Sequence, residues 1–322
     1  MATASLRNNW LSRLLVLSGL TWVGWLLMNG AADLEPAFLL KNWPWLVASL
    51  ALGALSVYHC APVFHILLNA NLKDPVPLSY STKLLFFGQV ARHLPGRFWG
   101  VLYQINETRS NMPALLLVKV NVDYTLFFLS FNLLAAVTIT VFRLYHPAMA
   151  LVLLLGGLVV ITAALHFDWF HVLLSHVQRF FPKPVRQRIQ AYLDPNNHSY
   201  STRNIAKLLL ISSSSWFFYL AAWACFPFIY PALKETDVFV LCATYTIAWA
   251  IGFVSMIVPA GLGVREAAFV LLSTPLADTG ELAFAAIFVR IWLLLIDLAI
   301  FAVTWLFITT TRRKPNAPPS RI

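Results

Sequence analysis

The feature that most restricts the fold is a series of long apolar segments separated by short polar ones. They cover residues 43–68, 113–142, 147–165, 205–230, 238–258 and 282–308, and a shorter one covers residues 14–28. About 20 apolar residues form a helix long enough to cross a bilayer. Inside lipid the backbone must satisfy its own hydrogen bonds, so such spans are helices. We therefore expect an all-α polytopic membrane bundle with about eight membrane segments, some of them broken or re-entrant.

The composition agrees with this class. The chain is 59% hydrophobic and 11% charged, whereas a soluble domain has about 25% charged residues. The net charge of +10 could indicate nucleic-acid binding, but the basic residues lie between apolar spans. This distribution favours a membrane face next to anionic lipid, so we expect no nucleic-acid partner.

The charge distribution also predicts an orientation. Residues 1–13, 69–119, 166–207 and 310–322 hold 18 of the 23 basic residues, whereas the connections 30–42, 143–147, 231–237 and 275–281 hold three basic and six acidic residues. The positive-inside rule then places both termini in the cytoplasm. It also requires the short helix at 263–272 to complete a crossing rather than to turn back. Residues 14–28 resemble a signal peptide as well, but we expect an uncleaved first span.

Residues 259–268 (Pro-Ala-Gly-Leu-Gly-Val-Arg-Glu-Ala-Ala) interrupt the apolar pattern. A charge at the bilayer centre costs at least ~3 kcal/mol, so this stretch predicts a helix break that faces a cavity. Gly261 and Gly263 permit the break, and the new helix start with Arg265 forms an anion site suited to phosphate. We expect Glu266 to point elsewhere, where it holds neighbours of Arg265, a proton or a cationic head group. The alternative is a structural Arg–Glu pair that links helices.

A second break lies at residues 94–100 (Leu-Pro-Gly-Arg-Phe-Trp-Gly). The apolar runs on either side, 84–90 and 98–105, are too short to span, so we expect a re-entrant hairpin or a broken helix. Arg92 and Arg97, with Gly96 between them, could meet a lipid phosphate near the cytoplasmic surface. The alternative is simple anchoring of basic residues at that surface.

Four further charges fall within apolar spans: Lys119, Asp123, Arg290 and Asp297. Such residues are expected to face the interior of the bundle. Arg290 and Asp297 share a face, two turns apart. Asp123 and Arg290 could pair with each other, or could complete a substrate site with Arg265 and Glu266.

The two breaks also suggest an internal repeat, because each leads into a short helix with an arginine near its start. We expect a single membrane domain over residues 1–309. Its halves are 1–165 and 204–309, possibly related as an inverted repeat and joined by a cytoplasmic linker at 166–203. Residues 310–322 form a basic, proline-rich tail.

Several function classes lack their motifs. No Walker loop, dinucleotide-binding fingerprint or nucleophile elbow appears. The three cysteines lie in apolar segments without metal-ligand spacing. We expect neither catalysis nor a cofactor nor a metal site.

At the two breaks, together with Gly88, Gln89 and the intramembrane Arg290, the sequence resembles the lysylphosphatidylglycerol synthase transmembrane-region family of flippase-like proteins. The resemblance covers about residues 14–308. It implies a bundle with re-entrant elements that binds a lipid head group in a bacterial inner membrane. In aminoacyl-lipid synthases this region flips the lipid made by a separate catalytic domain, and other members accompany glycosyltransferases of the cell envelope.

The resemblance thus implies a translocase for an anionic phospholipid or a polyprenyl-phosphate-linked sugar. Arg265 would hold the phosphate, Arg92 and Arg97 would gather the lipid, and the other intramembrane charges would stabilise or gate the cavity. A first alternative is a non-transporting accessory subunit of a glycosyltransferase. A second is a membrane glycosyltransferase that uses polyprenyl-phosphate sugars.

Overall fold

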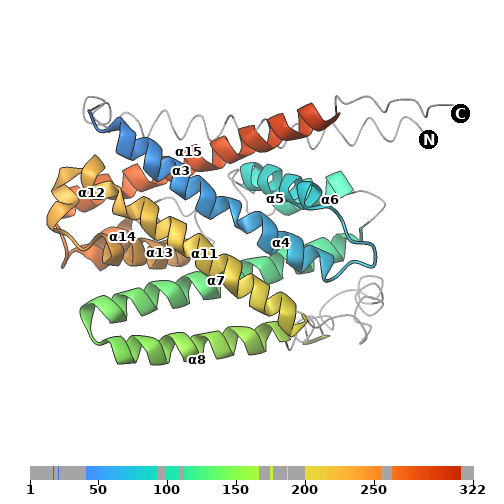
Figure 1. The fold of residues 1–322 in the computed structure, drawn as a ribbon, viewed down its shortest axis with the longest axis horizontal. Helices are drawn as coiled ribbons and strands as arrows, with labels where there is room; N and C mark the ends of the chain where they lie inside the picture. The colour runs from blue at the N-terminus through green and yellow to red at the C-terminus, as the bar shows by residue number, and fades with distance from the viewer. Residues whose placement is uncertain are drawn as a thin grey trace, which may run out of the picture.

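The computed structural model describes residues 17, 21, 41–92, 99–108, 112–166, 175–176, 187, 200–254 and 263–312. Every regular element in these ranges is helical, as Figure 1 shows. Five candidate membrane spans lie in them, at Trp43–Asn69, Ala114–Leu144, Pro147–His166, Thr202–Ile229 and Thr279–Phe307. They match five of the spans expected from the sequence and confirm the all-α membrane bundle. Of the segment expected at 14–28, only residues 17 and 21 are described.

Two of the spans consist of consecutive helices. The first is α3 (Trp43–Tyr58) followed by α4 (Cys60–Asn69), and the second is α11 (Thr202–Ala224) followed by the short α12 (Phe226–Ile229). The other three are the single helices α7 (Ala114–Leu144), α8 (Pro147–His166) and α15 (Thr279–Arg312). Pro113 and Pro147 stand at the starts of α7 and α8, where a missing N–H costs no helical hydrogen bond.

Four shorter helices form two pairs, and a short 3-10 helix, η3 (Pro231–Glu235), precedes the second pair. The first pair is α5 (Leu78–Arg92) and α6 (Trp99–Thr108), and the second is α13 (Val238–Val254) and α14 (Val264–Ser273). The breaks at 93–98 and 255–262 fall between the partners of each pair and lie outside the described residues.

Helix α14 turns back along α13. Near the break, a β-carbon on Gly252 would lie 3.0 Å from Cβ of Arg265. Further from it, Thr244 and Ser273 hydroxyls are 2.9 Å apart. In these contacts the residue number falls along α13 while it rises along α14, so the two helices form an antiparallel hairpin. The expectation that this helix completes a crossing is not confirmed and stays a prediction. Its 10 residues extend only about 15 Å, and the small Gly252 lets its start pack closely against α13.

Helices α5 and α6 form a similar hairpin. Phe87 stacks on Tyr103 with ring centroids 6.1 Å apart, and Lys83 forms an ion pair with Glu107. Of the two alternatives expected for this region, a re-entrant hairpin or a broken helix, these antiparallel contacts favour a hairpin. Whether either hairpin enters the bilayer without crossing it stays a prediction, since no membrane is part of the structure.

The elements follow the same order in two halves: a span of two helices, a hairpin and a long single helix. Helices α6 and α14 both contain 10 residues. The starts of α6 and α14, and those of α7 and α15, are both displaced by 165 positions (99 to 264, 114 to 279). Gly88 lies close to Gly100 in the first half, and Gly252 lies close to Arg265 in the second. The residue numbers of these two contacts are related by nearly the same displacement. This correspondence supports the predicted repeat.

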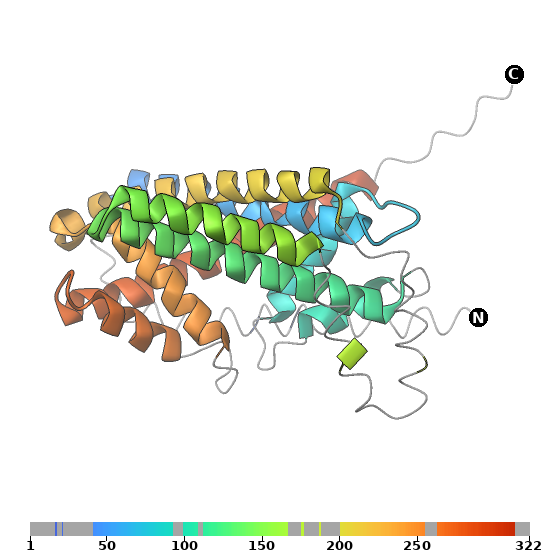
Figure 2. The ribbon, with the colours of Figure 1, turned by 90° about the horizontal axis from the view of Figure 1, so that it is seen from below.

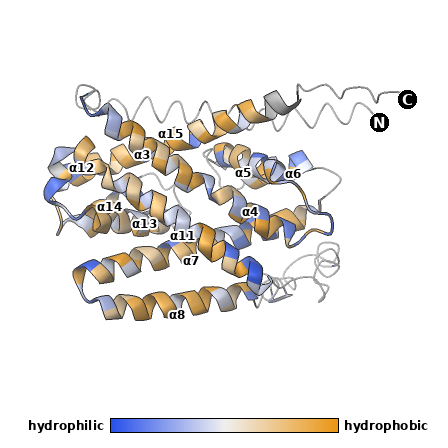
Figure 3. Cartoon of the chain, viewed as in Figure 1, coloured by the Kyte–Doolittle hydropathy of each residue, from blue (hydrophilic) through white to orange (hydrophobic). Residues whose placement is uncertain are grey.

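The halves run in opposite directions. The α3–α4 span packs antiparallel to the α11–α12 span, with Ser56 bonded to Ser215 at 3.1 Å and Asn71 bonded to Tyr200 at 3.2 Å. Figures 1 and 2 show α8 beside α7 at the edge of the bundle. Most of α8 is apolar and exposed, as lipid contact requires (Figure 3).

The connections with few basic residues gather at one end of the bundle. Arg143, at the end of α7, pairs with Asp237 at 2.6 Å. Tyr230, before η3, stacks on Phe284 in the first turns of α15, with centroids 4.6 Å apart. At the start of α3, Trp45 stacks on Phe228 of α12 at 4.3 Å. This grouping is the one that the charge distribution predicts for a single face of the membrane.

Candidate functional site

The site begins at the first turn of α14. Gly263 has φ +80°, a backbone conformation that residues with a β-carbon rarely adopt. Its N–H donates to Oε2 of Glu266 at 2.9 Å. This bond satisfies one of the unpaired amides of the helix start and fixes the carboxylate over it. The negative charge also suits the positive end of the helix dipole.

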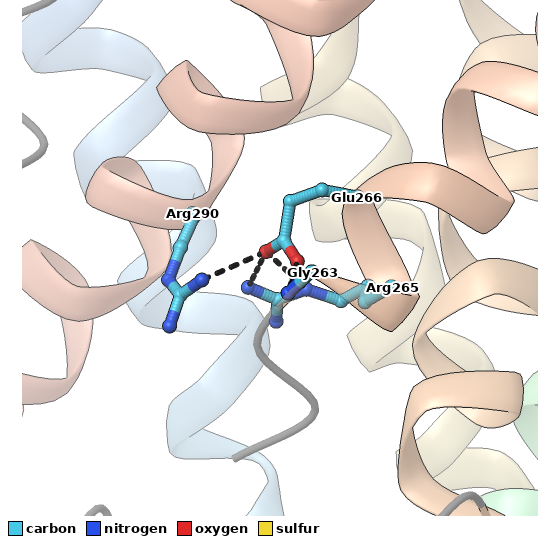
Figure 4. Close-up of polar contacts among 4 residues, drawn as sticks. All are labelled: Gly263, Arg265, Glu266 and Arg290. Atoms are coloured by element: carbon cyan, nitrogen blue, oxygen red, sulfur yellow. Dashed lines mark hydrogen bonds and ion pairs between the residues drawn. The ribbon is translucent and has the colours of Figure 1, made fainter. Parts of the chain in front are cut away.

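Glu266 then accepts from two arginines with its other oxygen (Figure 4). Arg265 donates to Oε1 through Nε at 3.3 Å and through a terminal nitrogen at 3.0 Å. Arg290, on α15, donates to the same oxygen at 3.0 Å. The expectation that Glu266 points away from Arg265 is wrong, because the long guanidinium side chain folds back over the helix start. The bond from Arg290 agrees with the expectation that Glu266 holds residues near Arg265.

The cluster of Arg265, Glu266 and Arg290 carries a net charge of +1, since two guanidinium groups share one carboxylate. Their side chains are only 13%, 19% and 17% exposed, so solvent screens the excess charge weakly. A guanidinium has five N–H donors, and Arg290 uses one of them on Glu266. An anion could therefore take further hydrogen bonds and balance the charge.

A residue of helix α13 also contacts Arg265. The guanidinium lies 5.5 Å from the ring centroid of Tyr245, in a cation–π contact. Tyr245 in turn packs on Phe269 of α14 and Trp223 of α11, with ring centroids 5.4 and 5.8 Å away. These aromatic rings hold the positive group at the junction of three helices.

Lys119 and Asp123 belong to a different cluster. Lys119 Nζ donates to Asp123 Oδ2 at 2.7 Å, and the hydroxyl of Tyr200 donates to the same oxygen at 2.5 Å. Lys119 is 1% exposed. Asp123 and Arg290 therefore have separate partners, and the pairing considered from the sequence is wrong. The second cluster ties Tyr200, two residues before α11, to the first third of α7.

The remaining predicted residues are only partly covered. Asp297 lies half-buried on α15, two turns beyond Arg290, and among the described residues it does not join the hydrogen bonds of Glu266. Arg92 ends α5, but its side chain lies outside the described part. Gly96, Arg97 and Gly261 lie outside it altogether. Their proposed contacts with lipid stay predictions, and so does a cavity at the breaks.

Sequence reasoning missed Tyr245, Gly252 and Tyr200. The first two lie inside a uniformly apolar segment, where no charge or break marks them. Tyr200 lies in the segment expected to be a cytoplasmic linker, although it is 3% exposed. Its neighbour Ser201, which caps α11 by accepting from the Asn204 N–H at 3.3 Å, was the available signal for a fixed position.

Comparison with known proteins agrees with this architecture. The family model described as lysylphosphatidylglycerol synthase TM region matches residues 10–300. Searches of curated proteins and of solved structures gave no significant match. Because the matched region covers both hairpins, the Arg265–Glu266–Arg290 cluster and all but the end of α15, the chain belongs to the lysylphosphatidylglycerol synthase transmembrane-region family.

Proposed function

We propose that this protein is a lipid translocase that binds the phosphate of an anionic membrane lipid at the cluster of Arg265, Glu266 and Arg290. The observation that carries the proposal is the excess of one positive charge in a cluster whose side chains are less than one-fifth exposed. A buried charge without a counter-ion is costly, so the cluster favours an anionic ligand. A monoanionic phosphodiester matches the charge.

Membership of a membrane-protein family of the lysylphosphatidylglycerol synthase type supports a lipid-related role. The ligand is an anionic phospholipid or a polyprenyl-phosphate-linked sugar, since both present a phosphate next to an apolar chain. Glu266 is a poor acceptor for a head-group amine, because its oxygens already take bonds from Arg265, Arg290 and Gly263.

The two hairpins support movement of the lipid between leaflets. They start from opposite ends of the bundle, and both pack against α15. Paired interruptions of this kind line the substrate sites of many transporters. We place the protein in a bacterial inner membrane with both termini in the cytoplasm, in accordance with its basic connections.

A reconstitution experiment tests the proposal. Vesicles containing fluorescent phosphatidylglycerol report its movement between leaflets through quenching from outside. We expect the wild-type protein to accelerate this movement over protein-free vesicles. Arg265→Gln and Arg290→Gln should each slow it about tenfold or more, because each removes a charged donor to the phosphate. The control Lys234→Gln removes an exposed charge outside the cluster and should have the wild-type rate.

One observation favours a second function. The bond between Glu266 and Arg290 also links α14 to α15, as a purely structural pair would. In a non-transporting accessory subunit of a glycosyltransferase, the cluster would need only this structural role. Wild-type vesicles without lipid movement, together with a transferase that co-purifies stoichiometrically, would support this function and contradict the first.

A further inference from the structure

A buried hydroxyl lies next to the charged cluster without a hydrogen-bond partner. Within the described residues, four buried side-chain polar atoms have no partner: Thr138 Oγ1, Ser212 Oγ, Trp223 Nε1 and Tyr245 Oη. Of these four residues, Tyr245 is the one whose ring contacts a guanidinium of the cluster. A buried hydroxyl without a partner is costly, so its retention calls for a group that satisfies it.

The position of this hydroxyl is fixed by packing. Tyr245 is 1% exposed, and Arg265, Phe269 and Trp223 cover its ring. A ring enclosed in this way has little freedom to turn its hydroxyl toward solvent. The contact of its ring with the Arg265 guanidinium places Tyr245 beside the charged cluster.

The surrounding polar groups define what could pair with it. Arg265 and Arg290 are donors only. Glu266 accepts from Gly263, Arg265 and Arg290, and the hydroxyl of Tyr245 has no bond to it. For the proton of the hydroxyl, the missing partner is therefore an acceptor that the cluster does not supply in this structure. A phosphodiester has two non-bridging oxygens, so one can accept from the guanidinium groups while the other accepts from a hydroxyl.

We propose that Tyr245 is a binding residue whose hydroxyl donates to a non-bridging oxygen of the lipid phosphodiester held by Arg265 and Arg290. This inference rests on the proposed function, and it adds an uncharged hydrogen-bond donor to the proposed phosphate site. The hydroxyl selects for a ligand with a second acceptor oxygen, which a single anionic point charge lacks.

The test compares Tyr245→Phe with the wild-type protein in detergent. The probe is short-chain phosphatidylglycerol, and its Kd is measured from the rise in the thermal unfolding midpoint during titration. Short-chain phosphatidylcholine tests the requirement for net negative charge, and sn-glycerol 3-phosphate tests whether a soluble phosphate suffices. Ser212→Ala is the matched control, because it removes another unpaired buried hydroxyl from α11.

We expect Tyr245→Phe to raise the Kd for phosphatidylglycerol about tenfold while its midpoint without lipid stays equal or increases. Ser212→Ala should leave the Kd unchanged. An unchanged Kd in Tyr245→Phe, while Arg290→Gln loses binding, would overturn this inference and leave the proposed function standing. A lower midpoint of Tyr245→Phe without lipid would overturn it too, since the hydroxyl would then have a partner within the protein.

Absence of phosphatidylglycerol binding to the wild-type protein would overturn the proposed function and this inference together. Equal binding of phosphatidylcholine would contradict the charge match. Tight binding of sn-glycerol 3-phosphate would assign the site to a soluble phosphate instead of a lipid.

Discussion

The bond between Glu266 and Arg290 gives the sharpest quantitative prediction. Glu266→Gln removes the only carboxylate of the cluster and leaves two guanidinium groups facing each other. Breaking a buried ion pair by removing one partner costs about 3–5 kcal/mol. Since these side chains are 13–19% exposed, we expect the lower end of that range, about 3 kcal/mol. Arg290→Gln leaves Glu266 paired with Arg265 and should cost about 1–2 kcal/mol.

The double variant Glu266→Gln, Arg290→Gln isolates the pair. We expect its loss of unfolding free energy to be smaller than the sum of the single losses by about 1–2 kcal/mol. Unfolding in mixed detergent micelles, followed by tryptophan fluorescence, measures all three values. The half-exposed pair Arg143–Asp237 is the control, and its coupling should stay below about 1 kcal/mol. Additive losses at Glu266 and Arg290, within about 0.5 kcal/mol, would refute the contact.

Two further predictions test the α13–α14 hairpin. Gly252→Val should destabilise the protein by about 1–3 kcal/mol, because even a β-carbon would lie 3.0 Å from Arg265. The matched change Gly156→Val on α8, where nothing lies within 4 Å, should stay within about 0.5 kcal/mol of wild type in the same unfolding assay. In a variant without native cysteines, Thr244→Cys with Ser273→Cys should cross-link on oxidation, because the two hydroxyls are 2.9 Å apart. Mass spectrometry of proteolytic fragments detects the link, and its absence would contradict the antiparallel arrangement.

The spans were predictable because lipid imposes a simple rule. An apolar run of sufficient length becomes a helix whatever its neighbours are, and prolines mark the starts of α7 and α8. The predicted bounds of these two helices differ from the observed ones by at most two residues. The hairpins were harder to predict. The return of α14 depends on the contact between Gly252 and Arg265, which no periodicity in either segment reveals.

The residues of the charged cluster were singled out from the sequence, and Arg290 was considered as a neighbour of Arg265 and Glu266, but the contacts of Glu266 were not predicted. Arg265, Glu266 and Arg290 were identifiable because charges in apolar segments are costly. The direction of the Glu266 side chain was not predictable in this way. Helical spacing alone gives no information on its bond to the amide of Gly263 or on the length of the arginine side chain. The pairing of Asp123 with Tyr200 joins α7 to a segment that sequence reasoning assigned to a linker.

The central claim is that the cluster of Arg265, Glu266 and Arg290 holds a lipid phosphate. Native mass spectrometry of the protein released from nanodiscs of defined composition tests it most directly. With equal amounts of phosphatidylglycerol and phosphatidylcholine, the wild-type protein should retain phosphatidylglycerol, and Arg265→Gln with Arg290→Gln should abolish that preference. Equal retention of the two lipids by the wild-type protein, or an unchanged preference in the double variant, would contradict the claim.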